Sequence, residues 1–164
     1  MIDAPYAEDG WDAALVEAAR AAMAHAYAPY SRFAVGAAVR LDDGAIIAGA
    51  NFENASLGLS LCAETVAIAS ANATGKLARV VAIAVIGGAM EGREMEEGAE
   101  ASSLPPITPC GRCRQIIAEA ASLAGRDIRV YCASLFGKEI AAYSVADLLP
   151  HAFSGADFSR PSRN

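Results

Sequence analysis

Residues 109–115 read Pro109-Cys110-Gly111-Arg112-Cys113-Arg114-Gln115, and a shorter stretch, Cys62-Ala63-Glu64, lies well upstream. Each stretch stands where a loop leads into a segment with helical hydrophobic spacing. Cys110 and Cys113 are three residues apart at a helix start, so both sulfurs can turn toward one point, and Cys62 can supply a third ligand. A lone Cys-x-x-Cys also occurs in redox sites and by chance. Together with the upstream stretch, it predicts a zinc ion with three protein ligands and a fourth position for water.

Glu64 lies two residues beyond Cys62 and can reach water on the metal without binding the metal itself. A carboxylate there can take a proton from water and deliver it to a ring nitrogen and then to a leaving amine. Three thiolates carry one more negative charge than the ion cancels. The positive ends of the two helices offset part of it, and we expect Arg112 or Arg114 to contribute hydrogen bonds or nearby positive charge as well.

Outward from these stretches, hydrophobic spacing predicts an α/β fold. Helices are predicted at 11–27, 61–74, 110–122 and 144–149, and strands at 33–41, 45–51, 79–86, 128–133 and 139–143. This order predicts a mixed sheet with helices on both faces. The segment 61–74 is nearly all apolar, so we expect a buried helix, and 79–86 is expected to be a strand buried on both faces. Residues 87–109 hold Gly, acidic side chains and Pro105-Pro106, which predicts a long surface loop, and 159–164 are expected to be a mobile tail.

Composition narrows the possible functions. The chain has 164 residues, of which 54% are hydrophobic and 20% charged, as expected for a single domain spanning 1–164 with a proper core. The net charge of −6 and the lack of a basic cluster disfavour a nucleic-acid partner. No apolar stretch approaches the roughly 18 residues that a membrane span needs, and the first ten residues do not resemble a secretion signal. We therefore expect a cytoplasmic protein whose four cysteines are ligands or core residues.

Five blocks of sequence resemble the homotetrameric cytidine deaminases of the three-cysteine zinc type. They are YAPYSRFAVGAA at 27–38, NFENAS at 51–56, CAE at 62–64, PCGRCRQ at 109–115 and LLPHAF at 148–153. Zinc nucleobase deaminases share the paired cysteine and glutamate signature. The resemblance implies a three-layer α-β-α fold with a mixed five-stranded sheet and one Zn²⁺ per subunit. It also implies hydrolysis of cytidine and deoxycytidine to uridine and deoxyuridine with release of ammonia, as in pyrimidine salvage.

The resemblance also assigns substrate contacts. Asn51 and Glu53 would hold the ribose hydroxyl, and Phe33 would pack against the pyrimidine. The backbone amide of Ala63 would bind the base carbonyl, and the carbonyl of Thr108 would face the amine. Phe153 would be supplied to the site of a neighbouring subunit, which implies a homotetramer.

Two departures from the family pattern keep alternatives open. Thr65 stands where three-cysteine members usually carry an arginine that bonds the zinc thiolates, and Leu57 replaces a common tyrosine. A Cys-Gly-Arg-Cys motif without that arginine also resembles blasticidin S deaminase, so a modified cytosine nucleoside is an alternative substrate. Two other classes are a nucleic-acid editing deaminase, which the net charge disfavours, and a zinc-stabilised binding module without catalysis, which Glu64 disfavours.

Overall fold

The computed structural model describes residues 10–90, 105–135 and 139–155, and its centre is a five-stranded mixed sheet. The strands are β1 (Phe33–Leu41), β2 (Ile46–Ala50), β3 (Val80–Ala89), β4 (Arg129–Ser134) and β5 (Ile140–Ser144), in the spatial order β2-β1-β3-β4-β5. Strand β1 runs antiparallel to β2 and β3, β3 is parallel to β4, and β4 is antiparallel to β5. The predicted mixed sheet is therefore confirmed.

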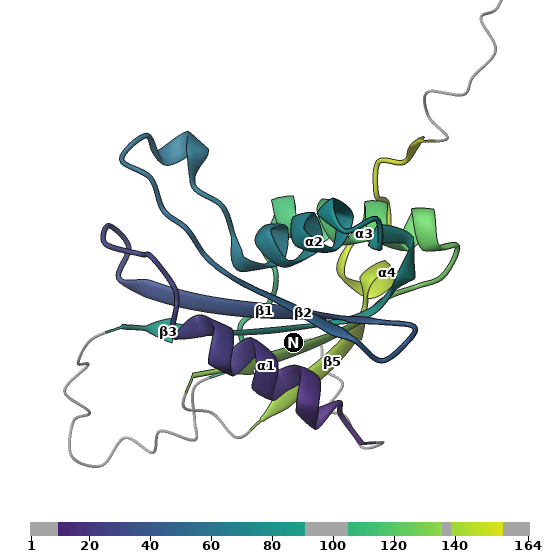
Figure 1. Cartoon of the computed structure of the whole chain (residues 1–164), viewed down its shortest axis with the longest axis horizontal. Helices are drawn as coiled ribbons and strands as arrows, with labels where there is room; N and C mark the ends of the chain where they lie inside the picture. Colours follow the sequence, from purple (N-terminus) through teal and green to yellow (C-terminus); the bar gives the residue numbers. More distant parts are fainter. Residues whose placement is uncertain (1–9, 91–104, 136–138, 156–164) are drawn as a thin grey trace, which may run out of the picture.

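Helices cover both faces of this sheet (Figure 1). They are α1 (Ala13–Met23), α2 (Ala63–Ala73), α3 (Gly111–Ala124) and the short α4 (Val145–Leu148), with 3₁₀ turns η1 (Leu57–Leu59) and η2 (Leu77–Arg79). Helix α1 packs on one face, while α2, α3 and α4 lie on the other. This is the predicted three-layer α-β-α arrangement. No helix in the described part of the chain is long and apolar enough to cross a membrane.

The alternation of side chains along β1 divides the core into two clusters. Ala37 and Val39 point toward α2 and α3 and join the larger cluster, whereas Ala38 joins the α1 cluster on the other face. Strand β3 contributes to both clusters, with Ile83 on the larger side and Ala84 on the α1 side. The prediction of a strand buried on both faces is confirmed by these contacts.

Two glycines allow helices to approach the sheet closely. A Cβ on Gly36 would lie 2.0 Å from the carbonyl oxygen of Ala19 in α1, and a Cβ on Gly49 would lie 2.6 Å from the backbone nitrogen of Ala67 in α2. Both distances are far below van der Waals contact, so no larger residue fits without displacing a helix. Gly49 thus sets the depth at which α2 rests on the sheet.

The first helix is shorter than the predicted 11–27. After Met23 the chain tightens into i→i+3 hydrogen bonds, and Tyr27 then pairs with the β2 extension: its N–H donates to the Asn51 carbonyl at 3.0 Å. The chain thus leaves the helix early because Tyr27 is bound to a neighbouring extended segment, a contact that helical periodicity does not reveal.

The predicted loop 87–109 is wrong at its start, because β3 continues to Ala89. Gly87 and Gly88 pair with Val35 and Ala34 of β1. A Cβ on Gly87 would meet the Ile107 side chain at 2.5 Å, so this glycine serves close packing and not a turn. Residues 91–104 of this segment, and the tail 159–164, lie outside the described residues.

Helix α2 also differs from its prediction. Leu61 lies outside the helix, where its N–H and carbonyl pair with Phe52 at 2.8 and 2.9 Å. Within the helix one face is buried, including Ala67 and Ala71, but Ala69 is exposed in the single chain. The apolar composition of this segment therefore exceeds what the core of one chain requires.

Candidate metal centre and active site

Three cysteine sulfurs converge at the N-terminal ends of α2 and α3. The Sγ atoms of Cys62, Cys110 and Cys113 all lie within 4.8 Å of one another, and those of Cys62 and Cys110 are 3.9 Å apart. Zinc–sulfur bonds of about 2.3 Å at tetrahedral angles place neighbouring sulfurs about 3.8 Å apart, so this donor set fits zinc. No further Cys, His, Asp or Glu among the described residues joins the group. The geometry is that of a three-ligand centre.

Helix starts place these ligands. Cys62 is the N-cap of α2 and Cys110 the N-cap of α3, both with extended backbone, and Cys113 lies in the first turn of α3. Backbone N–H groups of a first helical turn have no intrahelical partner and carry partial positive charge. Two helix N-termini therefore face the thiolates and offset part of their negative charge.

Two of the three thiols in this cluster, those of Cys62 and Cys113, have raised pKa values. Burial raises the pKa of Cys62, and burial together with the negative charges of Glu64 and the other two cysteines raises that of Cys113. A divalent cation reverses this balance because a coordinating thiol is deprotonated outright. The cluster is thus electrostatically suited to a cation.

Glu64 is buried, with only 4% of its surface exposed, in the first turn of α2 beside the sulfurs. Burial raises its pKa, and hydrogen bonding to its own backbone N–H and to the Cys113 side chain partly opposes this effect. A buried carboxyl without a salt bridge to a described Lys or Arg is costly in a purely structural role. It is, however, what a group that gives and takes protons beside a metal centre needs.

No arginine among the described residues donates a hydrogen bond to a sulfur of the cysteine cluster. Arg112 Nη1 donates to the Ser60 carbonyl at 3.4 Å, and Arg114 donates to the carbonyls of Pro109 and Leu148 at 2.8 and 3.1 Å. The contact made with a sulfur comes instead from Thr65, whose Oγ1 lies 3.8 Å from Cys113 Sγ. An effect of Arg112 or Arg114 on the thiolates stays a prediction.

Near the start of β1, two side chains that are expected to contact substrate are hydrogen-bonded to the backbone. Asn51 Nδ2 donates to the Phe33 carbonyl at 2.9 Å, and Asn51 Oδ1 accepts from the Val35 N–H at 2.9 Å. Glu53 Oε2 accepts from the N–H groups of Tyr30 and Ser31 at 2.9 and 3.2 Å, and hydrogen bonding to Ser31 lowers the pKa of Glu53. Both polar side chains therefore fix the backbone that leads into β1.

The remaining predicted residues occupy the two helix starts and the C-terminal segment. Ala63 is fully buried as the first residue of α2, and Thr108 precedes the buried Pro109 at the start of α3. Phe153 is 58% exposed, and its main chain is bound by the Gln115 side chain. Sequence reasoning assigned no role to Gln115, although it lies within the quoted stretch 109–115.

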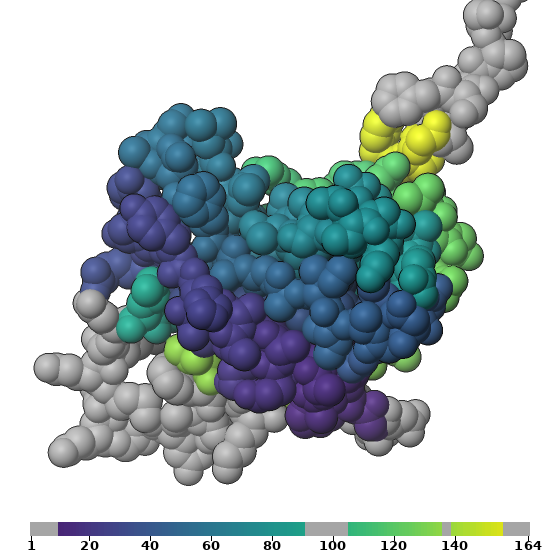
Figure 2. All heavy atoms as spheres, viewed as in Figure 1, coloured from purple at the N-terminus to yellow at the C-terminus, as the bar shows by residue number. Residues whose placement is uncertain are grey.

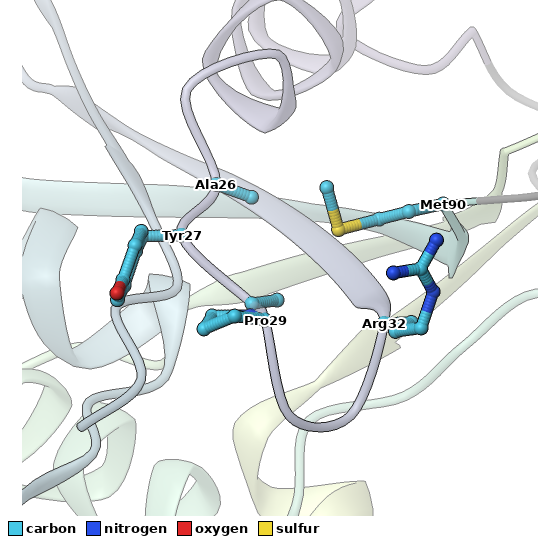
Figure 3. A pocket seen from close by; sticks show the side chains of 6 residues that line it. Ala26, Tyr27, Pro29, Arg32 and Met90 are labelled. Atoms are coloured by element: carbon cyan, nitrogen blue, oxygen red, sulfur yellow. The ribbon is translucent and has the colours of Figure 1, made fainter. Parts of the chain in front are cut away.

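A separate hollow of about 250 Å³ lies beside the loop before β1. It is lined by Ala26, Tyr27, Ala28, Pro29, Arg32 and Met90. Figure 3 shows the Arg32 guanidinium and the Met90 thioether on one side and Tyr27 on the other. This lining has no cysteine, histidine or carboxylate, so the hollow offers no set of ligands for a metal ion.

These features define a class: a three-cysteine metal centre at paired helix starts with a buried glutamate alongside is the site of a zinc-dependent deaminase. Residues 9–125 match the family model described as the cytidine and deoxycytidylate deaminase zinc-binding region. The cytidine deaminase of Halalkalibacterium halodurans is 43% identical over 145 residues, which cover 88% of this chain and 96% of the relative. That of Mycobacterium tuberculosis is 38% identical over 142 residues, which cover 87% and 89%.

Solved structures agree with these sequence relatives. The crystal structure of cytidine deaminase from Burkholderia pseudomallei has a TM-score of 0.72 and 41% identity, and the match covers 88% of this chain and 100% of that one. The cytidine deaminase from Mycobacterium tuberculosis has a TM-score of 0.62 at 36% identity, over 85% and 94% of the two chains. The chain belongs to the cytidine and deoxycytidylate deaminase family. The predicted fold, family and zinc dependence are confirmed.

Proposed function

We propose that the chain hydrolyses cytidine and deoxycytidine to uridine and deoxyuridine with release of ammonia, and that it does so in the cytoplasm. The observation that carries this proposal is the buried Glu64 beside three converging cysteine sulfurs in a chain of this family. A zinc-stabilised binding module without catalysis has no use for a buried carboxyl group at that place.

Cys62, Cys110 and Cys113 are the proposed zinc ligands. When bound, zinc acts as a Lewis acid that lowers the pKa of water to about 7 and so supplies a nucleophile at neutral pH. Glu64 accepts one proton of the attacking water and delivers it to the ring nitrogen, and it then transfers the remaining proton of the added hydroxyl to the amine, which leaves as ammonia. Its position in the first turn of α2 fixes the carboxyl group near the sulfurs without making it a ligand.

The substrate contacts are also proposals. Asn51 and Glu53 hold the ribose, Phe33 packs on the pyrimidine, and the backbone groups of Ala63 and Thr108 bind the base. The backbone bonds of Asn51 and Glu53 support this assignment because they hold both side chains in fixed orientations before substrate arrives. The hydroxyl groups of the sugar would give Asn51 and Glu53 a hydrogen-bond partner. A free base has no sugar, so it would leave both side chains without that partner.

We further propose a homotetramer in which Phe153 completes a neighbouring site. Figures 1 and 2 place the C-terminal described segment on the opposite side of the helical layer from the lobe of residues 51–61. Large apolar side chains that are exposed in the single chain also support assembly. They include Tyr27, Phe52, Leu57, Leu59 and Phe153.

Ammonia release tests the proposal directly, with cytidine, deoxycytidine, cytosine and blasticidin S as substrates. The expected result is fast turnover of both nucleosides and little turnover of free cytosine. Turnover of blasticidin S with none of cytidine would assign the alternative substrate, which the Leu57 and Thr65 departures leave open. The mass of the native assembly, measured by sedimentation, tests the tetramer, and a monomer at assay concentration would contradict it.

A further inference from the structure

The side-chain amide of Gln115 binds both polar main-chain groups of Phe153. Gln115 Nε2 donates to the Phe153 carbonyl at 2.7 Å, and the Phe153 N–H donates to Gln115 Oε1 at 3.2 Å. A side-chain amide that pairs with both polar groups of one residue acts as a neighbouring strand would act. Two bonds fix the position and also the rotation of that residue's backbone, which a single bond does not.

The preceding residue holds the other end of the same segment. Arg114 Nη1 donates to the Leu148 carbonyl at 3.1 Å, and its Nε donates to the Pro109 carbonyl at 2.8 Å, directly before Cys110. The start of α3, with its N-cap, therefore carries Cys110 and Cys113 and also binds residues 148 and 153. We name residues 148–153 the C-terminal arm. The Phe153 side chain is largely exposed on it, although its backbone is bound in place.

We propose that Gln115 is a positioning residue whose effect on catalysis is felt in the site of a neighbouring copy of the chain and not in its own. The inference rests on the proposed function, because it requires Phe153 to be supplied to that neighbour. Gln115 holds the backbone of Phe153 in place before the ring enters the neighbouring site. The conformational entropy of this backbone is therefore already lost in the donor chain, and docking of the ring does not have to order it. Without Gln115 the arm samples many positions, and the ring reaches the neighbouring site less often.

The variant Gln115→Leu removes both hydrogen bonds at nearly constant volume. We expect a roughly tenfold rise in KM for cytidine with a smaller change in kcat, as two lost hydrogen bonds of ordinary strength predict. Zinc content is expected to equal that of the parent protein, because the metal ligands keep their helix. Gln115→Glu retains an acceptor for the Phe153 N–H but sets a carboxylate oxygen against the Phe153 carbonyl oxygen, so its KM should rise at least as much as that of Gln115→Leu.

Mixed assemblies separate action in the neighbour from action in the same chain. Gln115→Leu is co-expressed with Glu64→Ala under two different affinity tags, and assemblies that contain both chains are isolated in two steps. Sites that combine Glu64 of one chain with Phe153 and Gln115 of the other are intact, so the KM of the active sites should return toward the parent value. Phe153→Ala co-expressed with Glu64→Ala is the matched control.

Each outcome decides between the proposals. No recovery for Gln115→Leu, with recovery for Phe153→Ala, would show that Gln115 acts within its own chain and would overturn this inference alone. No recovery for either pair would overturn the shared site itself. A Gln115→Leu chain with unchanged KM, or with lost zinc, would also contradict a positioning role for Gln115.

Discussion

Replacing Gly49 by alanine is expected to weaken both catalysis and stability, because this glycine sets the position of the helix that carries Glu64. The new Cβ would lie 2.6 Å from the Ala67 nitrogen and 3.0 Å from the Ala63 carbonyl oxygen, whereas ordinary contact begins near 3.4 Å. Helix α2 must therefore retreat by about 0.8 Å at Ala67. Overpacking of this size costs about 1–3 kcal/mol of unfolding free energy.

The same shift displaces Glu64 from the sulfurs on α3, which do not move with α2. A misplacement of about 1 Å at a reacting group can lower turnover roughly 100-fold, so kcat for cytidine should fall by about 10- to 100-fold at saturating zinc. Urea denaturation and ammonia release measure the two effects on the same preparation. The magnitude follows from a contact with backbone, which cannot rotate away as a flexible side chain could.

Two other glycines serve as matched controls. Gly58→Ala places its Cβ in open space and should leave both stability and turnover unchanged. Gly36→Ala collides with the Ala19 carbonyl oxygen of α1 at 2.0 Å, so it should destabilise more than Gly49→Ala but lower kcat of the folded fraction less. Parental turnover in Gly49→Ala, with stability reduced, would refute the link between the depth of α2 and catalysis.

Two further substitutions test the site and the fold. Glu64→Gln should keep zinc and the folded state but lose roughly 100- to 10,000-fold in turnover, because the amide cannot carry a proton; retained turnover would rule out the assigned role. Asp12→Asn keeps an N-cap acceptor for α1 but loses the ion pair with Arg40, at a cost of about 1 kcal/mol at pH 7. Hydrogen bonding to Arg40 lowers the pKa of Asp12, so this stabilisation is present above the ordinary carboxyl pKa and disappears as pH falls through the lowered value. A stability gap between parent and Asp12→Asn that stays constant down to pH 2 would contradict this assignment.

The metal centre could be predicted from the sequence because its information is local. Cys110 and Cys113 share one helix turn, and Cys62 and Glu64 share another, so residue spacing alone fixes each half. The element order also followed from hydrophobic periodicity, including the short helix after Ser144, which begins with a reciprocal capping box between Ser144 and Asp147.

The features that were missed depend on contacts between distant segments. Gly87 and Gly88 suggest a loop by composition, but they are strand residues that make room for Ile107 and Leu135. The Gln115–Phe153 pairing joins residues 38 positions apart and has no local signal. Ala69 of α2 is exposed although its segment is nearly all apolar, because composition alone does not tell which residues of a helix pack on the core.

The most direct test is the zinc content of the purified chain and of its single-cysteine variants, measured by elemental analysis. The account predicts one zinc per chain in the parent and in Cys132→Ala, since Cys132 is a buried core residue of β4 outside the sulfur cluster. It predicts that zinc is lost in Cys62→Ala, Cys110→Ala and Cys113→Ala. Full zinc occupancy in any of these three variants, or its loss in Cys132→Ala, would contradict the three-thiolate centre.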